Sequence, residues 1–323
     1  MKLAILGPGR IADKVAQTLV QLPEMECYAV ASRTPGKAAA FAEKFGFAKV
    51  YTSYGEMLSD PNVELVYITT PHSHHYEQIC LCLEHGKHVI CEKAFTINAE
   101  QARKVRSLAA EKGLYVAEAI WTRYMPSRQL IDRILESGVI GRVNTLTANL
   151  SYNVAYKTRL TDPALAGGAL LDIGIYGLNF ALMHFGDDIE RIESSVRLTD
   201  TGVDAMETMT CFYRDGRMAV LTHSIYCRSD RKGIIHGDKG YLVVENINNP
   251  QSVSVYDDND KLLAYYEVPR QISGYEYEFQ EAVRCIREGK LESDSMPMDR
   301  TVQVMELMDS LRKQWGVVYP QER

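Results

Sequence analysis

Short apolar segments alternate with amphipathic segments along the first 120 residues of the chain. In the amphipathic segments apolar residues recur every three or four positions, which is typical of a helix with one buried face. We expect strands at Leu3–Leu6, Tyr28–Ser32, Glu64–Thr69, His88–Cys91 and Leu114–Ala119, alternating with helices at Arg10–Leu22, Ala38–Phe45, His74–Leu83 and Asn98–Lys112. This alternation predicts an α/β domain with a doubly wound parallel sheet covered on both faces.

The pattern changes after Trp121, where longer segments alternate between apolar and polar residues. We expect strands at Arg142–Tyr152, Ile189–Leu198, Glu207–Tyr213, Met218–Tyr226, Gly240–Glu245 and Ser252–Tyr256, with helices at Ser127–Glu136, 275–288 and 299–313. Turns such as Asp215-Gly216 separate the strands, so the sequence predicts an α+β domain with a large, mainly antiparallel open sheet. We divide the chain into domains at residues 1–120 and 121–323.

Composition and charge exclude several classes of protein. The 323 residues include 36 Lys and Arg against 42 Asp and Glu, a formal charge of −6 without a basic block, so we expect no nucleic-acid or membrane partner. The longest uncharged apolar segment, Ile173–Phe185, is shorter than the ~20 residues of a spanning helix. Seven cysteines are scattered without a disulfide-like framework, which favours the cytoplasm.

A glycine-rich turn, Gly7-Pro8-Gly9-Arg10-Ile11-Ala12, follows the first predicted strand and opens a helix. It fits G-x-G-x-x-G/A, in which Gly7 permits the tight turn and Gly9 lets the backbone approach a pyrophosphate. In this strand–turn–helix context, amides such as those of Arg10 and Ile11 point at phosphate oxygens. We therefore predict a dinucleotide-binding Rossmann domain over residues 1–120, and the alternative is a purely structural glycine turn.

The end of the second predicted strand indicates which dinucleotide binds. An NAD site usually has an Asp or Glu there to hold the ribose 2′-hydroxyl, whereas this chain has Ser32-Arg33-Thr34. A guanidinium makes charge-assisted hydrogen bonds to a 2′-phosphate, which a carboxylate would repel. We predict a preference for NADP, with NAD possible as well if Arg33 is only a solvated surface residue.

Two segments carry polar residues that packing does not require. The first, Gly86–Ala94, is a strand that ends in Glu92-Lys93 at the carboxyl edge of the sheet, where α/β proteins bind ligands. The second, Gly167–Tyr176, contains Asp172 and Tyr176, which face the same way if the segment is helical.

With these segments the sequence resembles the glucose–fructose oxidoreductase and inositol dehydrogenase (Gfo/Idh/MocA) family over essentially its whole length. The resemblance rests on GPGRIA, TTPHSHH (Thr69–His75), GKHVICEK, EAIWTRYMP (Glu118–Pro126) and GGALLDIGIY. The Trp-Thr-Arg segment, and a Tyr at position 176 where inositol dehydrogenases tend to carry His, make the chain look most like the dimeric dihydrodiol dehydrogenase branch.

The resemblance implies hydride exchange between a substrate carbinol carbon and a nicotinamide. It makes Lys93 the catalytic lysine, Tyr176 the general acid/base and Asp172 the acidic residue of the same motif. An ammonium within ~4–6 Å lowers the pKa of a phenol by about 1–3 units, so Lys93 could tune Tyr176, hydrogen-bond the reacting oxygen, or both. The alternatives are a surface lysine, a core tyrosine and an aspartate that caps a helix or orients a neighbour.

One position departs from the family pattern. The family usually has Pro after Glu-Lys, often preceded by a cis bond, and this chain has Ala94. A cis bond before a non-proline residue costs about 2.5–4 kcal/mol. Either the Lys93-Ala94 bond is trans and other contacts orient Lys93, or the cis bond is retained.

The other expected cofactor contacts come from strand ends. Thr70, Pro71 and His75 belong to a T-P-x-x-x-H pattern, in which His75 is expected to line the cofactor cleft. A metal site at His72, His74 and His75, or at Cys82, His85, His88 and Cys91, is the disfavoured alternative, because no acidic ligand lies near the former and the latter diverge. The expected cofactor-binding residues are Gly7, Gly9, Arg10, Ile11, Ser32, Arg33, Thr70, Pro71, His75, Glu92 and Lys93.

Aromatic and basic residues near the domain junction are candidates for substrate binding. Trp121 and Arg123 lie at this junction, where clefts form, and Trp121 either stacks on a sugar or aromatic ring or packs between domains. Tyr152 and Tyr156 are further candidates for the same cleft.

These observations predict an NADP-dependent oxidoreductase that acts on a CH–OH group of a sugar, polyol or cyclic diol. We expect a homodimer or homotetramer formed through the outward face of the C-terminal sheet. A non-catalytic NADP-binding sensor is the alternative from another class. Within enzymes, the alternative is an oxidoreductase whose tightly held cofactor shuttles hydride between two sugars.

Overall fold

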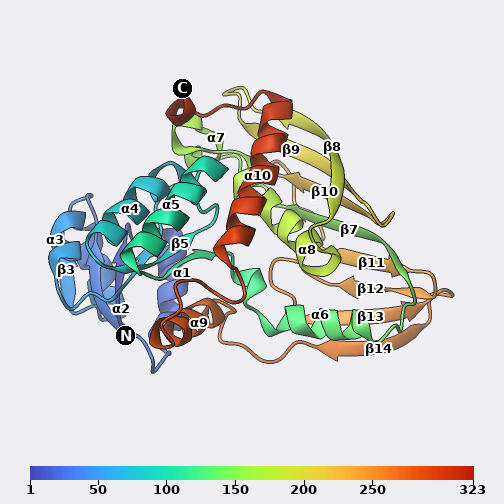
Figure 1. The fold of residues 1–323 in the computed structure, drawn as a ribbon, viewed down its shortest axis with the longest axis horizontal. Coiled ribbons are helices and arrows are strands. Elements are labelled where there is room, and N and C mark those ends of the chain that lie inside the picture. Colours follow the sequence, from blue (N-terminus) through green and yellow to red (C-terminus); the bar gives the residue numbers. More distant parts are fainter. The chain divides into compact units, whose positions relative to one another are not determined.

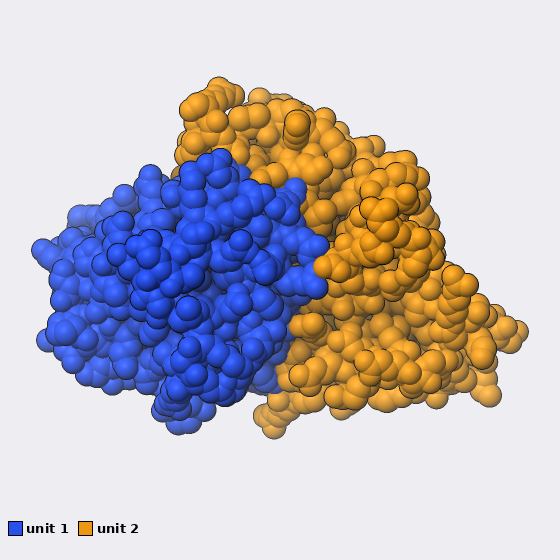
Figure 2. All heavy atoms as spheres, viewed as in Figure 1, with its two compact units in different colours: residues 1–124, 271–306 blue, residues 125–270, 307–323 orange.

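The computed structural model describes residues 1–323, which form two compact units. Unit 1 comprises residues 1–124 and 271–306, and unit 2 comprises residues 125–270 and 307–323, as coloured in Figure 2. The chain therefore leaves unit 1 close to the predicted boundary at residue 120. It also contributes residues 271–306 to unit 1, which the division into 1–120 and 121–323 did not include.

Unit 1 contains a six-stranded sheet in the order β3-β2-β1-β4-β5-β6 (Figure 1). Every pairing in it is parallel, which confirms the predicted doubly wound sheet. The strand order reverses between β1 and β4, and α/β proteins bind ligands at the carboxyl ends of strands at such a point. The strands are β1 (Lys2–Leu6), β2 (Glu26–Ala31), β3 (Lys49–Tyr51), β4 (Leu65–Ile68), β5 (His88–Glu92) and β6 (Val116–Ala119).

The crossovers of unit 1 are helical, as the periodicity predicts. Asn98 caps one of these helices, because its side chain accepts a hydrogen bond from the Gln101 amide at 3.0 Å. The helices are α1 (Arg10–Leu19), α2 (Lys37–Phe45), α3 (Tyr54–Ser59), η1 (His72–His74), α4 (His75–Glu84), α5 (Ala99–Lys112) and η2 (Trp121–Arg123). Short β3 and α3 were not predicted, since segments of three and six residues carry too little periodicity.

Residues 271–306 belong to unit 1 because α9 (Glu276–Arg287) buries an apolar face in its core. Phe279, Ala282 and Val283 join the same buried cluster as residues of β1 and α1. The ring of Phe279 meets that of Tyr67 on β4 edge-on, with centroids 5.1 Å apart. The sequence predicted this helix but gave no indication of the sheet on which it packs.

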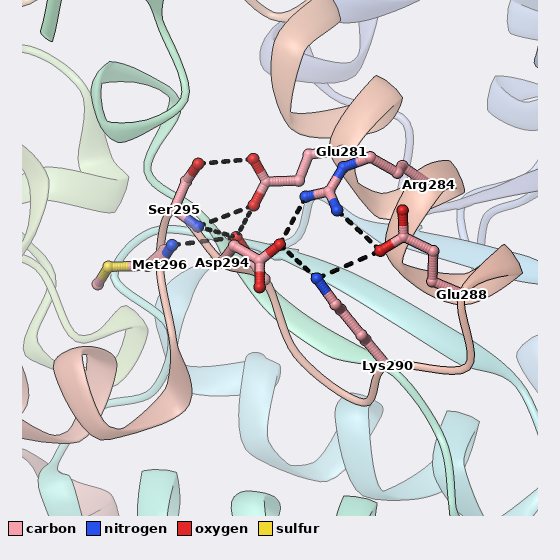
Figure 3. A network of polar contacts seen from close by, with 8 residues as sticks. Glu281, Arg284, Glu288, Lys290, Asp294, Ser295 and Met296 are labelled. Atoms are coloured by element: carbon pink, nitrogen blue, oxygen red, sulfur yellow. Dashed lines mark hydrogen bonds and ion pairs between the residues drawn. The ribbon is translucent and has the colours of Figure 1, made fainter. Parts of the chain in front are cut away.

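A polar network holds the turn between α9 and α10 (Met298–Trp315), as Figure 3 shows. Asp294 accepts hydrogen bonds from Arg284 at 2.8 Å and from Lys290 at 2.7 Å. On the other side of the turn, Glu281 of α9 accepts from the amide and the hydroxyl of Ser295, at 2.9 and 2.6 Å. These contacts fix the path by which the chain leaves α9.

Unit 2 contains an eight-stranded sheet in the order β14-β13-β12-β11-β7-β10-β9-β8 (Figure 1). All its pairings are antiparallel except that of β7 with β10, so the predicted mainly antiparallel sheet is confirmed. The strands are β7 (Val143–Ser151), β8 (Ile189–Leu198), β9 (Asp204–Tyr213), β10 (Met218–Ser224), β11 (Gly233–Gly237), β12 (Gly240–Val244), β13 (Ser252–Asp257) and β14 (Leu262–Glu267). The sequence analysis missed β11, which begins and ends with Gly, and β14, whose residues are mostly exposed on both faces.

The helices of unit 2 include one that forms its core. The π-helical turn η4 (Leu170–Gly174) leads into α8 (Ile175–Phe185), and both pack on β7 and β10. Pro163–Phe185 is long and apolar enough to cross a membrane, but 83% of its most apolar window is buried, as in the core helix of a soluble protein. The other helices are α6 (Pro126–Glu136), α7 (Thr158–Thr161), η3 (Pro163–Leu165) and η5 (Pro320–Glu322).

Candidate functional site

The glycine-rich turn after β1 leaves the start of α1 without a side-chain cap. Gly7 has a φ of +81°, and a Cβ there would lie 2.4 Å from Cγ2 of Thr70, so only glycine fits this close approach. Gly9 is the N-cap residue of α1, and no side chain hydrogen-bonds to the first turn. The amides of Arg10 and Ile11 and the positive end of the helix are thus available to a phosphate, as the motif predicts.

The turn after β2 carries a basic residue and no carboxylate. Arg33 is exposed, and its guanidinium carbon lies 5.5 Å from the centre of the Tyr54 ring. The buried Ser32 hydroxyl accepts a hydrogen bond from the Thr34 amide at 3.1 Å, which shapes the turn. His74 lies close enough to Arg33 that burial and this positive charge together lower the pKa of its imidazole. The residues present therefore suit an anionic ligand better than a neutral ribose hydroxyl.

His75 is completely buried, and its predicted contact with the cofactor remains a prediction. Its Nε2 lies 2.8 Å from the carbonyl oxygen of Thr70, and its Nδ1 lies 2.8 Å from that of Ala94. Burial lowers its pKa to about 4, so the ring is neutral near pH 7. A neutral imidazole has one N–H, so it donates a hydrogen bond to only one of the two carbonyl oxygens. The other ring nitrogen lies beside the second oxygen without a proton between them. His75 therefore connects the loop after β4 to the loop after β5.

Lys93, which is half-buried, lies in this second loop, and a buried carboxyl holds the loop from β6. Oε1 of Glu118 accepts a hydrogen bond from the Phe95 amide at 3.0 Å. Burial raises the pKa of Glu118 to about 7, although the charges of Arg123 and Lys93 act in the opposite direction. The Lys93-Ala94 peptide bond is cis in the structure, which answers the question left open by the sequence.

Glu92, the residue before Lys93, is turned into the protein. It is only 8% exposed, and one of its carboxylate oxygens accepts a hydrogen bond from the Tyr67 hydroxyl. Burial raises the pKa of the Glu278 carboxyl on α9, and the nearby negative charge of Glu92 raises it further. Glu92 thus supports the end of β5 from within unit 1, and its predicted contact with a cofactor remains a prediction.

The second candidate segment lies at the start of α8 in unit 2. Asp172 in η4 and Tyr176 in α8 are both half-buried, and both lie in helical segments. The sequence predicts that their side chains face the same way if the segment is helical. The two carboxylate oxygens of Asp172 accept hydrogen bonds from the two terminal nitrogens of the Arg159 guanidinium, at 2.9 and 3.2 Å. Such a fork fixes the orientation of the carboxylate. Arg159, which the sequence analysis did not identify, therefore holds Asp172 in place, and the predicted role of Asp172 in the reaction remains a prediction.

Two of the expected substrate residues lie inside unit 1. Trp121 is 8% exposed and stacks on Tyr275, with ring centroids 4.1 Å apart and planes 14° apart. This stacking lies within unit 1, and the predicted contact of Trp121 with a substrate remains a prediction. Arg123 is 5% exposed, and its charge acts on the buried carboxyl of Glu118. Both residues help to build the end of β6.

The other two lie in unit 2 near the end of β7. The Tyr152 hydroxyl accepts a hydrogen bond from the Asn248 side chain at 3.1 Å. Tyr156 is 76% exposed, with the Lys157 ammonium 5.7 Å from its ring centre. No group of three or more His, Cys, Asp or Glu side chains is arranged to hold a metal ion.

A doubly wound sheet with an uncapped glycine-rich helix start at its switch point defines a nucleotide-binding α/β protein. Comparison with known families agrees and goes further: the chain belongs to the GFO/IDH/MocA oxidoreductase family. Residues 1–119 match the family described as "Oxidoreductase family, NAD-binding Rossmann fold", and residues 129–243 match "GFO/IDH/MocA C-terminal domain". The resemblance given by the sequence motifs is thereby confirmed.

Individual relatives match along the full length of the chain. Trans-1,2-dihydrobenzene-1,2-diol dehydrogenase of Mus musculus is 32% identical over 336 residues, covering 100% of this chain and 99% of the relative. D-xylose 1-dehydrogenase (NADP(+)) of Hypocrea jecorina is 34% identical over 373 residues, covering 99% and 93%. The crystal structure of a 3-ketoreductase from Actinomadura kijaniata, in complex with NADP and TDP-benzene, superposes with a TM-score of 0.90 at 25% identity, covering 97% of each chain.

Proposed function

We propose that this chain is an NADP-dependent oxidoreductase that transfers a hydride between the nicotinamide and a CH–OH carbon of a sugar, polyol or cyclic diol. The observation that carries the proposal is the full-length similarity to relatives named as dehydrogenases of a cyclic diol and of xylose. The alternative is a non-catalytic NADP-binding sensor that keeps the glycine-rich turn and uses the second unit for protein contacts. The presence of both Lys93 and Tyr176 argues against it, because a sensor does not need them.

The residues of unit 1 suit NADP. Glycines at positions 7 and 9 leave room for a pyrophosphate at the start of α1, whose first amides no side chain caps. Arg33 stands where an NAD-specific site has a carboxylate, and its guanidinium would bind a 2′-phosphate. The xylose dehydrogenase relative carries NADP(+) in its name, and the 3-ketoreductase structure contains NADP. Thr70 and Pro71, which end the loop after β4, complete the proposed cofactor contacts.

The reaction needs a group that exchanges a proton with the substrate hydroxyl while the nicotinamide accepts or donates the hydride. We assign the proton exchange to the Tyr176 phenol, whose ordinary pKa of about 10 is too high for an effective base at neutral pH. We assign to Lys93 the role of the catalytic lysine that the family motif implies, and to Asp172, held by Arg159, the orientation of the segment before Tyr176. Tyr156 is the exposed aromatic residue that we propose for substrate contact.

The assembly and the compartment belong to the same proposal. Four large apolar residues of the edge strand β14 are exposed, namely Leu262, Leu263, Tyr265 and Tyr266. Exposed apolar side chains on a sheet favour association, so we propose a homodimer or homotetramer through the sheet of unit 2. All seven cysteines are free thiols, which fits a reducing cytoplasm.

The test is a substrate panel with the purified full-length protein. The protein is incubated with NADP⁺ or NAD⁺ and with trans-1,2-dihydrobenzene-1,2-diol, D-xylose, other aldoses and polyols, and the absorbance of reduced nicotinamide is followed. We expect turnover of at least one diol or sugar, faster with NADP⁺ than with NAD⁺. Binding of NADP⁺ without turnover of any compound would instead indicate a sensor. Cofactor retained through purification and reduced only in a stoichiometric burst would indicate hydride exchange between two sugars.

A further inference from the structure

A buried pair of titratable residues lies beneath the helix that carries Tyr176. Glu207 on β9 and His223 on β10 face each other directly across the two strands, and both side chains are 0% exposed. Nδ1 of His223 lies 3.5 Å from Oε1 of Glu207. The neighbouring positions on the same face of these strands are apolar, among them Met209 and Leu221. We call Glu207 and His223 the buried pair.

We propose that the buried pair positions Tyr176: the two side chains form the surface on which the first turn of α8 rests, and they thereby set where the Tyr176 phenol stands. The proposal rests on the proposed function, in which Tyr176 is the general acid/base. Glu207 and His223 are positioning residues in this role, because they act on the reaction through the helix.

The contacts with the helix are made at two glycines that flank Tyr176. A Cβ on Gly174 would lie 2.5 Å from Oε1 of Glu207, and a Cβ on Gly177 would lie 2.2 Å from Nε2 of His223. Neither glycine needs its conformational freedom, since both have helical backbone angles or lie within a helix. Glycine occurs at these positions because the buried pair fills the space that a side chain would take. The helix and the pair are therefore in close contact on both sides of Tyr176.

A third carboxyl group extends the same support to the segment before η4. Asp204 at the start of β9 accepts a hydrogen bond from the Leu170 amide at 2.5 Å, and a Cβ on Gly168 would lie 2.3 Å from its Oδ1. Side chains from two adjacent strands thus contact the motif from Gly168 to Gly177. The motif is held from below along most of its length.

The side chains of the buried pair are polar, although protein cores consist mainly of apolar side chains. Neither nitrogen of His223 has a hydrogen-bond partner, and burial lowers its pKa to about 3. Burial raises the pKa of Glu207 to about 8, so both groups are neutral near pH 7. Buried polar groups without partners destabilise a fold, and an apolar pair would fill the same space without that loss. Their retention beneath the proposed acid/base residue points to a role in the reaction.

The test disturbs the close contact between Gly177 and His223 from each side in turn, and a double variant then restores the packing. Gly177→Ala adds a methyl group against the imidazole, His223→Ala removes the imidazole, and the double variant gives the methyl group the vacated space. We measure kcat and the KM values of NADP⁺ and of the diol or sugar turned over by the wild type, at a temperature where every variant is folded by calorimetry. A displacement of about 1 Å at a reacting group lowers turnover by on the order of 10²-fold.

We expect Gly177→Ala to lower kcat by roughly that factor with little change in the KM of NADP⁺, and the double variant to recover at least about tenfold of the loss. His223→Ala alone, which introduces no clash, should lower kcat about tenfold or more. Glu207→Gln keeps the shape of the carboxyl group and should retain kcat within about threefold.

Two control variants separate positioning from stability. Leu221→Ala removes a fully buried side chain from the same face of β10 and should lower the melting temperature while leaving kcat nearly unchanged. Gly55→Ala adds a methyl group to α3, where the nearest atom would lie 3.8 Å away, and should leave kcat unchanged without lowering the melting temperature, because alanine favours a helix more than glycine does. A merely structural pair would instead make His223→Ala behave like Leu221→Ala.

The outcomes are distinguishable from failure of the proposed function itself. If Tyr176→Phe retains wild-type kcat, the proposed function fails whatever the other variants do. If Tyr176→Phe is inactive but His223→Ala keeps wild-type kcat, the positioning role is overturned and the function stands. The positioning role is likewise overturned if the double variant is no more active than Gly177→Ala. Should Gly177→Ala not fold, the comparison of His223→Ala with Leu221→Ala decides the question alone.

Discussion

Nδ1 of His75 lies 2.8 Å from the carbonyl oxygen of Ala94, the residue directly after Lys93. The same imidazole contacts the Thr70 carbonyl at 2.8 Å, so one buried ring spans the loops that follow two neighbouring strands of the sheet. The loop that carries the candidate lysine is therefore held by a completely buried histidine.

His75→Ala should lower kcat through Lys93. Loss of the ring releases the loop after β5, and a displacement of about 1 Å at the lysine lowers turnover by on the order of 10²-fold. The dissociation constant of NADP⁺, measured by fluorescence titration, should change far less, because the glycine-rich turn is untouched. The matched control is His85→Ala at the exposed end of α4. An equal loss of NADP⁺ affinity and turnover in His75→Ala would show that the ring supports the cofactor site as a whole.

Glu118→Gln should change how the free energy of unfolding depends on pH. The folded-state pKa of Glu118, raised by burial to about 7, exceeds the ordinary value of 4.5, so the folded protein binds this proton more tightly than the unfolded chain. The resulting stabilisation is complete below about pH 4.5 and is lost as the pH rises to about 7, by ~3 kcal/mol. The glutamine keeps an acceptor for the Phe95 amide but does not titrate.

Urea unfolding of wild type and Glu118→Gln at about pH 5 and about pH 8 measures this difference. The buried His75 and His223 titrate in the opposite direction, but they contribute equally to both proteins and cancel in the comparison. Identical pH dependence in the two proteins would show that the Glu118 pKa is not raised in the folded state.

Arg33→Ala should reduce the preference for NADP⁺ over NAD⁺. A charge-assisted hydrogen bond to the 2′-phosphate contributes about 1.5–3 kcal/mol, so the ratio of kcat/KM for the two cofactors should fall about 10–100-fold. Lys37→Ala at the start of α2 removes an exposed positive charge nearby and serves as the control. An unchanged ratio in Arg33→Ala would mean that Arg33 is only a surface residue beside Tyr54.

Trp121→Ala should act on stability rather than on substrate affinity. The indole is buried against Tyr275, and removal of a buried Trp side chain costs about 3–5 kcal/mol. A double-mutant cycle with Tyr275→Ala should give a coupling energy of about 0.5–1.5 kcal/mol for the stacked rings. A raised KM for the sugar or diol, at unchanged stability, would instead support the substrate role that the sequence predicts.

The fold could be predicted from the sequence because its signals are local. Helical periodicity, turn residues and the glycine-rich motif each lie within a few positions of one another, and they located the parallel sheet and most of the second sheet. The edge strand β14 was missed because both of its faces are largely exposed, so no alternation marks it. The packing of α9 in unit 1 was missed because the contact of Phe279 with Tyr67 joins residues far apart in the chain.

The candidate site divides in the same way. Lys93, Tyr176 and Asp172 lie in motifs that can be recognised from neighbouring residues alone. The groups that hold them, such as His75 and Arg159, are ordinary polar residues whose role depends on a partner elsewhere in the chain. The family pattern marked His75 but did not show that both ring nitrogens contact backbone carbonyls. The two glycines at 174 and 177 were a local signal of close packing, but only the structure shows that the buried pair fills the space beneath them.

The most direct test of the account is a single-turnover measurement of NADP⁺ reduction by Tyr176→Phe and Lys93→Ala beside the wild type. The diol or sugar found in the substrate panel is used, and saturation with cofactor is verified by titration. We predict that the rate of hydride transfer in Tyr176→Phe falls by about 10²–10⁴-fold, the usual contribution of a general acid/base, while NADP⁺ binds as in the wild type. Hydride transfer at the wild-type rate in Tyr176→Phe would contradict the account.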